Sequence, residues 1–351
     1  MRKSIEKKTI ALVQGDPAGI GPELLVNLML QQDVRDAANL VLIGDRKILA
    51  RGEKQVGKKI HNVRSIKENE PMMFNCEEVL HIDVSIDGIT NVAVGQVSRE
   101  GGLSSILALK KSLELSKDGI VDGIVFLPFN KESMHMGGNN FTDELGYASD
   151  FFDLKTRVSE FNVAEGIWNG RVTSHVAMKD VSKLLTVNRI DESIVLAYQT
   201  LSMAGYANPR IVVAAYNPHA GDGGLMGDEE IRVIRPAVKL ARSKGLNVDG
   251  PFPADTLWLK VKDGKYDVVV TMYHDQGQIA IKLLGFDKGV SVLAGLPIPL
   301  TTPAHGTAFD ITGLNIANII PTQNAFFMCL EMAKNLDGTK KISKSRNAVA
   351  V

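Results

Sequence analysis

Short apolar runs rich in β-branched residues alternate with longer segments of helical periodicity, and this rhythm constrains the fold more than any other feature of the sequence. The runs are KTIALVQ, NLVLIGD, DGIVFLP, RIVVAAY and YDVVVTMY, and the helical patterns cover residues 22–32, 102–117, 188–204, 228–244 and 322–336. Strands separated by helices of this length are typical of βαβ units, in which the strands run parallel. The sequence therefore predicts an α/β fold with a mostly parallel central sheet.

Length and charge exclude several classes of protein. A chain of 351 residues, 44% of them hydrophobic, is long enough for a large core and favours two lobes. With 40 Lys and Arg against 40 Asp and Glu there is no basic excess to bind nucleic acid. No apolar stretch reaches the 18 or so residues that a membrane helix needs, and the start MRKSIEKK leads into too short an apolar run for a signal peptide.

Cysteine content points to the cellular compartment. Cys76 and Cys329 are too few for a disulfide framework and lack the paired spacing of a zinc ribbon. We expect a reducing, cytoplasmic setting.

Two glycine-containing segments have open interpretations. In GDPAGIGPE, residues 15–23, Gly19 and Gly21 permit close backbone approach, and Pro22 suits a first helical turn. The spacing matches neither a dinucleotide fingerprint nor a Walker loop, so a tight structural turn and a ligand cradle remain equal alternatives. Residues 131–147 are polar and Gly-rich, which is typical either of an active-site loop or lobe crossover or of a solvated surface loop.

Three of the seven histidines share one context. Each of them follows a β-rich run and lies in a strand-end loop that contains Gly, Asp or Asn: His175, His219 and His274. Ligands of open α/β sheets gather beyond the carboxyl ends of strands, so three imidazoles there could bind a divalent metal and leave positions open for substrate. Each histidine alone is equally explained as a hydrogen-bonded structural group. His61 and His81 lack this context and are expected to be surface or structural residues.

The segment HGTAFDITG, residues 305–313, joins a histidine, a turn of small residues and a carboxylate. Free backbone amides in such a turn can bind a nucleotide phosphate, and Asp310 could accept from a ribose or cap the next turn. Lys131 and Asp255 are ambiguous between functional groups and, respectively, a solvated amine and a helix cap. No GxSxG, HExxH or Walker motif supports an esterase, a zincin or a P-loop enzyme.

Together these segments are similar to one family. GDPAGIGPE, PFNKE, TSHVAMKD, NPHAGDGGLMGDEE, GPFPADT, MYHDQGQIAIK and HGTAFDITG occur in this order across nearly the whole chain. The chain resembles the 4-hydroxythreonine-4-phosphate dehydrogenases of pyridoxine biosynthesis and their sugar-acid phosphate and dihydrodiol relatives. HGTAFDITG also resembles the adenosine-binding loop of isocitrate and isopropylmalate dehydrogenases. The resemblance implies their two-lobed fold, with the active site in the cleft between the lobes.

The resemblance implies lobe boundaries and site residues. A dinucleotide-binding lobe would comprise residues 1–128 and 290–351, and a metal, substrate and dimerisation lobe residues 129–289. A homodimer would share the metal site, with one ligand from the partner subunit. The implied site has metal ligands His175, His219 and His274, substrate-binding Lys282, and NAD- or NADP-binding His305, Gly306, Thr307, Ala308 and Asp310. The metal would be Zn, Mg, Co or Mn.

Three departures from the family pattern concern the substrate. Asp143 and Glu144 stand where phosphorylated-substrate enzymes have Gly-His, Ser291 replaces a substrate-binding Asn, and Leu300 replaces an Arg. An arginine fork grips phosphate well, whereas leucine offers no hydrogen bond. The loss of this fork and the two added carboxylates should disfavour a doubly charged phosphate ester. A dihydrodiol carboxylate, as in the dehydrogenases of the terephthalate pathway, is the alternative substrate.

The expected reaction oxidises the secondary alcohol of a hydroxy acid to a ketone, with hydride passing to the nicotinamide. Decarboxylation follows if a carboxylate lies β to the ketone. Lys131, Asp255 and Asp275 are the candidates for proton relay or support of the metal ligands. A non-catalytic metabolite-binding protein and a metal-dependent hydrolase or lyase are the alternatives, and neither predicts reduction of NAD or NADP.

Overall fold

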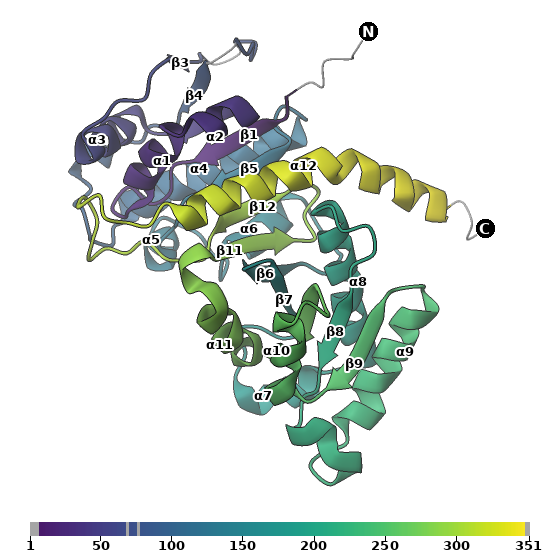
Figure 1. The fold of residues 1–351 in the computed structure, drawn as a ribbon. Coiled ribbons are helices and arrows are strands. Elements are labelled where there is room, and N and C mark those ends of the chain that lie inside the picture. The colour runs from purple at the N-terminus through teal and green to yellow at the C-terminus, as the bar shows by residue number, and fades with distance from the viewer. Residues whose placement is uncertain (1–6, 68–69, 76–77, 348–351) are drawn as a thin grey trace. The chain divides into compact units, whose positions relative to one another are not determined.

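The computed structural model describes residues 7–67, 70–75 and 78–347 (Figure 1). Cys76 lies outside these residues. The chain forms two compact units, Met1–Asp153 with Leu296–Lys334, and Leu154–Gly295 with Asn335–Val351. No helix within the described ranges is long and apolar enough to cross a membrane. The division of dinucleotide and metal binding between residues 1–128 with 290–351 and residues 129–289 stays a prediction.

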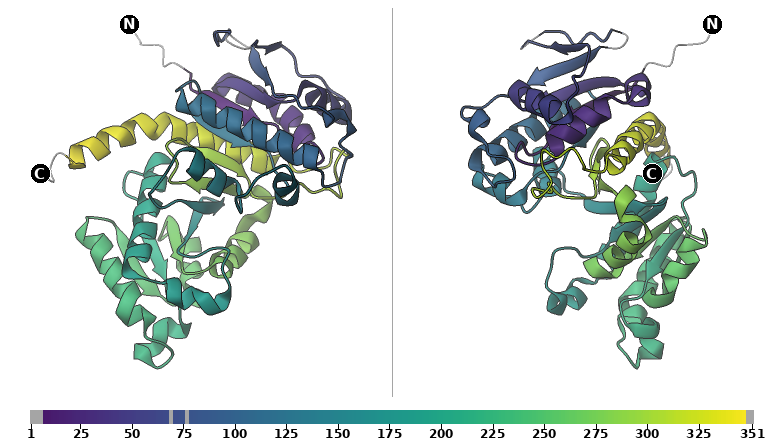
Figure 2. Two further views of the ribbon diagram at one scale, coloured as in Figure 1. Left: turned by 180° about the vertical axis from the view of Figure 1, so that it is seen from behind. Right: turned by 60° about the vertical axis from the view of Figure 1, so that its left-hand side comes forward.

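The first unit has a parallel sheet in the order β3-β4-β2-β1-β5-β12. Helices cover its strands (Figure 2). In chain order its elements are β1 (Thr9–Val13), α1 (Gly21–Met29), α2 (Gln32–Ala37), β2 (Asn39–Gly44), α3 (Arg46–Val56), β3 (Val63–Ser65), β4 (Val79–Asp83), η1 (Ile89–Asn91), α4 (Arg99–Lys117), β5 (Gly123–Phe126), α5 (Lys131–Met136), α6 (Glu144–Phe151) and β12 (Leu300–Pro303), and α12 (Ile320–Asn347) begins here.

The second unit has the strand order β11-β6-β7-β10-β8-β9. The pairs β11–β6 and β6–β7 are antiparallel, and β7, β10, β8 and β9 pair in parallel. In chain order its elements are β6 (Ser159–Ala164), β7 (Ile167–Arg171), α7 (Met178–Leu184), α8 (Val187–Met203), β8 (Ile211–Ala214), η2 (Pro218–Gly224), η3 (Glu230–Ile234), α9 (Arg235–Ser243), β9 (Val248–Phe252), α10 (Ala254–Lys262), β10 (Val268–Thr271), α11 (His274–Gly285), η4 (Phe286–Lys288) and β11 (Val290–Ala294).

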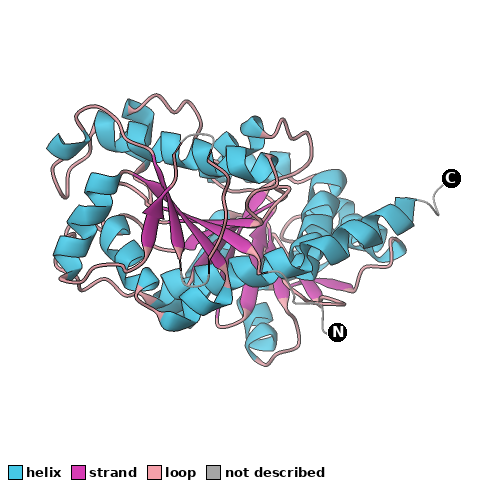
Figure 3. Cartoon of the chain, turned by 90° about the horizontal axis from the view of Figure 1, so that it is seen from above, coloured by secondary structure: helices cyan, strands magenta, loops and turns pink. Residues whose placement is uncertain are grey.

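The predicted α/β class with a mostly parallel sheet is confirmed. The five apolar runs form β1, β2, β5, β8 and β10, whose residues are buried except for Asn39 at one strand start. Strands buried on both faces read as continuous apolar runs, and helices flank them (Figure 3). The segment 228–244 divides into a π-helical turn and α9, because Pro236 at the start of α9 has no backbone N–H to donate.

The interpretation of residues 131–147 as an irregular loop is wrong in part, since the segment holds α5 and the start of α6. Each helix has an N-terminal cap that stabilises it: Asn130 accepts from the backbone N–H of Ser133, and Asp143 accepts from that of Gly146. Such caps satisfy an N–H that has no partner inside the helix. The carboxylate of Asp143 therefore has a local structural role.

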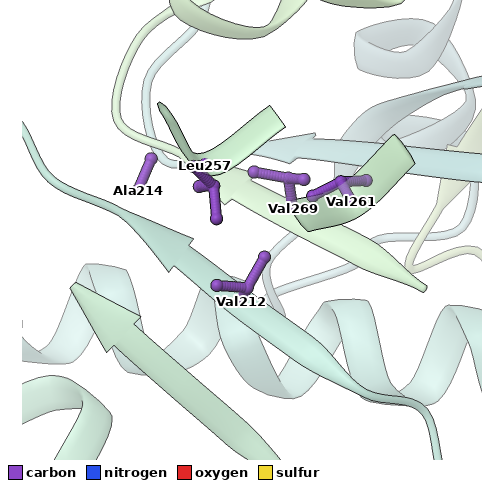
Figure 4. Packing of buried hydrophobic residues seen from close by; sticks show 5 residues of the cluster. All are labelled: Val212, Ala214, Leu257, Val261 and Val269. Atoms are coloured by element: carbon purple, nitrogen blue, oxygen red, sulfur yellow. The ribbon is translucent and has the colours of Figure 1, made fainter. Parts of the chain in front are cut away.

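Helix α10 is held on the second unit by a small apolar cluster. Leu257 and Val261, four residues apart on one helix face, pack over Val212, Ala214 and Val269 of β8 and β10 (Figure 4). All five side chains are at most 2% exposed, and burying a leucine or valine contributes roughly 1.5–3 kcal/mol. The cluster fixes α10 over the strands whose carboxyl ends lead to His219 and His274.

Helices α4 and α5 approach so closely at Gly102 that no side chain fits there. A Cβ at Gly102 would lie 1.6 Å from the backbone oxygen of Ser133. We expect Gly102→Ala to lower the free energy of unfolding by about 3 kcal/mol or more, because backbone must move to relieve the clash. Urea denaturation measures the change.

Gly146→Ala is the matched control for this substitution. Its Cβ would meet nothing closer than 3.5 Å, so alanine should be neutral or stabilise α6 slightly. Equal midpoints for the two variants would contradict the close approach at Gly102.

Candidate functional site

The three histidines follow the carboxyl ends of three neighbouring parallel strands in the second unit. His175 lies beyond β7, His274 begins α11 directly after β10, and His219 lies beyond β8. The strand order β7-β10-β8 brings these three ends to one edge of the sheet. This is the edge at which open α/β sheets bind ligands. Their role as metal ligands stays a prediction.

Two of these imidazoles are spaced to share one ion. The ring centroids of His175 and His274 are 5.6 Å apart. Two imidazoles on one tetrahedral zinc ion, with Zn–N bonds of about 2 Å, would have centroids roughly 5 Å apart. Nδ1 of His274 lies 2.7 Å from Oδ1 of Asp275, which leaves Nε2 as the free ring nitrogen. A carboxylate behind a histidine in this way is typical of metal sites.

The described residues show no complete set of metal ligands. Within residues 7–67, 70–75 and 78–347, no group of three or more His, Cys, Asp or Glu side chains is placed to hold a metal ion. The rings of His175 and His274 lie close together, and His219 lies beyond the end of the neighbouring strand β8.

The loop bearing His219 has an unusual backbone held by a buried carboxylate. Residues 219–223 all have positive φ, including the non-glycine residues His219, Ala220 and Asp222. Such conformations cost energy and persist only where the surroundings fix them. Glu230 is fully buried and accepts from the backbone N–H groups of Tyr216 and Asn217. We did not predict Glu230 from the sequence; its only signal is a charged run after a Gly-rich loop.

Two further predicted site residues, Asp275 and Lys282, lie on helix α11, and hydrogen bonds connect this helix to a third, Ser291. Asp275 and Lys282 are exposed on α11. Gln278 Nε2 donates to Asn162 Oδ1 (2.6 Å), and Asn162 Nδ2 donates to the hydroxyl of Ser291 (3.0 Å). Ser291 is 5% exposed and donates in turn to Glu160 (2.7 Å). The serine hydroxyl is therefore engaged within the protein.

In the first unit, GDPAGIGPE packs against HGTAFDITG. The N–H of Ile20 donates to the carbonyl of Thr307 (3.0 Å), and a Cβ at Gly19 would lie 2.9 Å from Cβ and O of Thr307. Glu23, which is 1% exposed, accepts from the N–H of Gly313 (2.8 Å), and burial raises the pKa of its carboxyl. The first motif therefore forms a tight turn that packs against the second motif, and its role as a ligand cradle stays a prediction.

The predicted dinucleotide segment combines exposed and buried groups. Gly306 and Asp310 are exposed, Thr307 is buried, and Ala308 has a φ of 44°. Nε2 of His305 is buried without a hydrogen-bond partner in the described structure, and burial lowers the pKa of this imidazole. A neutral ring with an unused nitrogen is suited to a ligand contact. Dinucleotide binding by His305, Gly306, Thr307, Ala308 and Asp310 stays a prediction.

The remaining predicted residues belong to both units. Lys131 is exposed at the start of α5, and Glu144 lies half-buried in the first turn of α6. Leu300 is fully buried in β12. These three belong to the first unit, whereas Asp255, exposed in the first turn of α10, belongs to the second. The catalytic and substrate roles of these residues stay predictions.

His61 and His81 occupy the positions expected of surface and structural residues. His61 is exposed, and its backbone carbonyl accepts from Arg35. His81 is 1% exposed, with Nε2 3.1 Å from the carbonyl of Gly44 and Nδ1 3.3 Å from Oγ of Ser65. Burial lowers the pKa of His81.

Asp16 gives the first unit a pH dependence. It is fully buried, its Oδ1 accepts from the N–H of Ala18, and desolvation raises the pKa of its carboxyl. The folded state therefore holds this proton more tightly than the unfolded state, so the stabilisation is present at low pH and is lost as pH rises through the raised pKa.

We expect the melting temperature of Asp16→Asn to increase relative to wild type as pH rises from about 4, because the amide does not ionise. Thermal denaturation across pH 4–8 measures the difference, and any constant effect of the substitution cancels. A difference independent of pH would contradict the raised pKa.

Comparisons with known proteins cover nearly the whole chain. The family model described as "Pyridoxal phosphate biosynthetic protein PdxA" matches residues 36–329. The "Putative 4-hydroxythreonine-4-phosphate dehydrogenase 2" of Rhizobium meliloti is 44% identical over 93% of this chain and 94% of the relative. The D-threonate 4-phosphate dehydrogenase of Salmonella typhimurium is 38% identical, over 88% and 93%.

Solved structures extend the similarity to the fold. The 4-hydroxythreonine-4-phosphate dehydrogenase of Klebsiella pneumoniae superposes with a TM-score of 0.81 at 33% identity, covering 93% of this chain and 99% of that one. A terephthalate 1,2-cis-dihydrodiol dehydrogenase of Burkholderia xenovorans gives 0.65 at 26% identity, covering 92% and 98%. The chain belongs to the PdxA family of pyridoxal phosphate biosynthetic proteins, as the resemblance in its sequence motifs indicates.

Proposed function

We propose that this chain is a metal-assisted, NAD- or NADP-dependent dehydrogenase that oxidises the secondary alcohol of a phosphorylated hydroxy acid. The observation that carries the proposal is the placement of His175, His219 and His274 at three adjacent strand ends, with two of the rings 5.6 Å apart. Family membership supports the dehydrogenase reaction, because the relatives and structures above are named as dehydrogenases.

The three histidines would hold one divalent ion, and Zn, Co, Mn and Mg are the candidates. Imidazole ligands suit Zn and Co better than Mg, which prefers oxygen. When bound, such an ion lowers the pKa of a coordinated hydroxyl and polarises the neighbouring oxygen. Asp275 would orient the ring of His274 through the 2.7 Å contact with Nδ1 and so leave Nε2 for the ion.

The other predicted site residues would bind the substrate, bind the dinucleotide or relay protons. Lys282 would pair with an anionic group of the substrate, and His305 to Asp310 would bind the dinucleotide. The exposed amine of Lys131 and the exposed carboxylate of Asp255 are free of the constraint that ties Asp275 to His274, so they are the better candidates for proton relay. Decarboxylation of a β-keto acid product is part of the proposal for substrates that carry the required carboxylate.

Phosphorylated hydroxy acids are the first candidate class of substrate. The relatives at 38% and 44% identity are named for such compounds, whereas the dihydrodiol dehydrogenase is 26% identical. Asp143, which the sequence suggested would repel a phosphate, serves as the cap of α6. The second candidate is a dihydrodiol carboxylate, favoured by Leu300, which cannot donate to a phosphate.

A homodimer that shares the metal site is part of the proposal. Exposed apolar side chains follow each histidine within nine residues in the sequence: Val176, Met178, Leu225, Met226, Ile279 and Leu283, at 39–85% exposure. Exposed apolar groups gathered around a site are typical of surfaces that a partner covers. Light scattering on the purified chain should give twice the mass of 38.1 kDa.

An absorbance assay at the reduced-nicotinamide band tests the function. The protein is given Zn, Co, Mn or Mg, NAD or NADP, and one of three substrates: 4-hydroxythreonine 4-phosphate, D-threonate 4-phosphate or a terephthalate dihydrodiol. We expect turnover with a phosphorylated substrate that a chelator abolishes. Turnover of the dihydrodiol alone would support the second candidate. No reduction with any substrate, despite dinucleotide binding, would support a non-catalytic binding protein.

A further inference from the structure

A row of hydrogen bonds crosses the carboxyl ends of β7, β10 and β8 just before the three histidines. The N–H and Oγ1 of Thr173, after β7, both donate to the carbonyl of Met272, after β10 (3.1 and 2.7 Å). The N–H of Met272 donates to Oε1 of Gln276 (2.7 Å), and Nε2 of Gln276 donates to the carbonyl of Ala215, after β8 (2.7 Å). Each strand end therefore contributes one member to a single connected row.

This row of hydrogen bonds lies just beyond the end of the backbone pairing between β10 and β8. The last paired residues of β10 and β8 are Val270 and Val213, so the ladder between these strands does not extend to Met272 and Ala215. Beyond the ladder, the side-chain amide of Gln276 connects the two segments, because it accepts from Met272 after β10 and donates to Ala215 after β8. Met272 is fully buried and Thr173 is 1% exposed, so the bond from the Thr173 side chain to the Met272 carbonyl is buried, whereas the two bonds of Gln276 are partly buried.

The position of the row in the sequence links it to the site. Thr173 precedes His175 by two residues, Met272 precedes His274 by two, and Ala215 precedes His219 by four. Loops are the most mobile parts of a fold, yet metal ligands must be held within a few tenths of an ångström. A connection immediately before each ligand is well placed to meet that demand.

We propose that Gln276 is a positioning residue that, together with Thr173, sets the spacing of the three histidine loops and so the affinity for the divalent ion. This inference rests on the proposed function. The side-chain amide of Gln276 bonds to the backbone of Met272 and Ala215, and it acts on the histidine loops through these two contacts. The bonds also exclude an alternative packing of the loops, since a buried carbonyl left without its donor costs about 1–3 kcal/mol.

The test measures affinity for Co²⁺ or Zn²⁺ alone by calorimetry on the full-length protein, with no nucleotide or substrate. Gln276→Leu keeps the side-chain volume and removes both bonds. We expect its affinity to fall about 10–100-fold, as for loss of other partners behind a metal ligand. The visible spectrum of the Co²⁺ form should change as well, because a shifted ligand alters the coordination geometry.

Thr173→Val is the second variant, in case Gln276→Leu does not fold. It removes only the Oγ1 bond to Met272 and retains the backbone bond from the same residue. We expect a smaller loss of affinity, of about 3–10-fold, consistent with about 1 kcal/mol for one hydrogen bond.

The opposite ends of the same two strands offer a matched control. Before β8 and β10, the backbone N–H of Arg210 donates to Oδ2 of Asp267 (2.7 Å), and its guanidinium pairs with the same carboxylate. Arg210→Met weakens this connection far along the strands from the histidines. We expect it to lower thermal stability and to leave affinity for the metal within twofold of wild type.

The outcomes separate the two hypotheses. If wild type binds metal and both Gln276→Leu and Thr173→Val bind it equally well, the positioning role is overturned and the proposed function stands. If Arg210→Met loses affinity as strongly, the effect is general strand destabilisation, which also overturns the positioning role. If wild type binds no divalent ion, the proposed function fails and the inference fails with it.

Discussion

Replacing His219 with alanine is expected to remove bound metal and dinucleotide reduction together while the fold stays intact. His219 supplies one of three imidazoles at adjacent strand ends, and its side chain is exposed. Truncation therefore removes no buried contact, and stability should change by only about 0.5 kcal/mol. Affinity for the ion should fall at least about a hundredfold, the upper figure for loss of a group that merely supports a ligand. Elemental analysis after dialysis and the nicotinamide absorbance assay measure both quantities.

His61→Ala is the control for this substitution. His61 is also exposed, and Arg35 donates to its backbone carbonyl, which alanine retains. Metal content and turnover should equal those of wild type. Full turnover by metal-free His219→Ala would falsify the metal-assisted mechanism, whereas retained metal with lost turnover would give His219 a different role.

The part of the fold that could be predicted is the part in which apolar burial alone decides the structure. The strands β1, β2, β5, β8 and β10 are nearly continuous apolar runs, because parallel strands covered on both faces have no polar side to reveal. The strands β6, β7 and β11 gave no such signal. They contain Asn162, Arg171 and Ser291, buried polar residues whose hydrogen bonds to each other or to Glu160 form only in the folded unit.

The same division applies to the site. The β-rich runs before His175, His219 and His274 predicted their placement at strand ends, because parallel strands direct their carboxyl ends to one edge. The side chains that hold these loops in place could not be predicted from the sequence. Glu230 and Gln276 act through backbone atoms of residues distant in sequence, and no local pattern encodes such a contact. The positive φ of His219 is equally hidden, since glycine, the usual signal for it, is absent at that position.

The two motifs of the first unit were predicted separately, and the structure joins them. A sequence reader sees Gly19 as a residue that permits a turn. In the fold, the segment HGTAFDITG packs directly against Gly19. Any residue with a Cβ at this position would clash with Thr307. If residues 305–310 bind the dinucleotide, as proposed, then Gly19 is required for that binding although it lies in a different loop.

Gly19→Ala is expected to weaken binding of NAD and NADP about tenfold or more, equivalent to ~1.4 kcal/mol, and to leave metal affinity unchanged. The added Cβ would lie 2.9 Å from both Cβ and the backbone oxygen of Thr307, so the dinucleotide segment must shift. A displacement of about 1 Å can cost about a hundredfold in a well-aligned site. Fluorescence titration with each dinucleotide, with metal present, measures the loss.

The metal provides the internal control, because His175, His219 and His274 belong to the second unit and Gly19 to the first. His219→Ala should bind dinucleotide and lose metal, and Gly19→Ala should bind metal and lose dinucleotide. This reciprocal pattern would separate the two binding functions and show that neither variant is simply unfolded. If Gly19→Ala binds both dinucleotides as tightly as wild type, residues 305–310 do not form the dinucleotide site, and the cofactor must contact a different part of the chain.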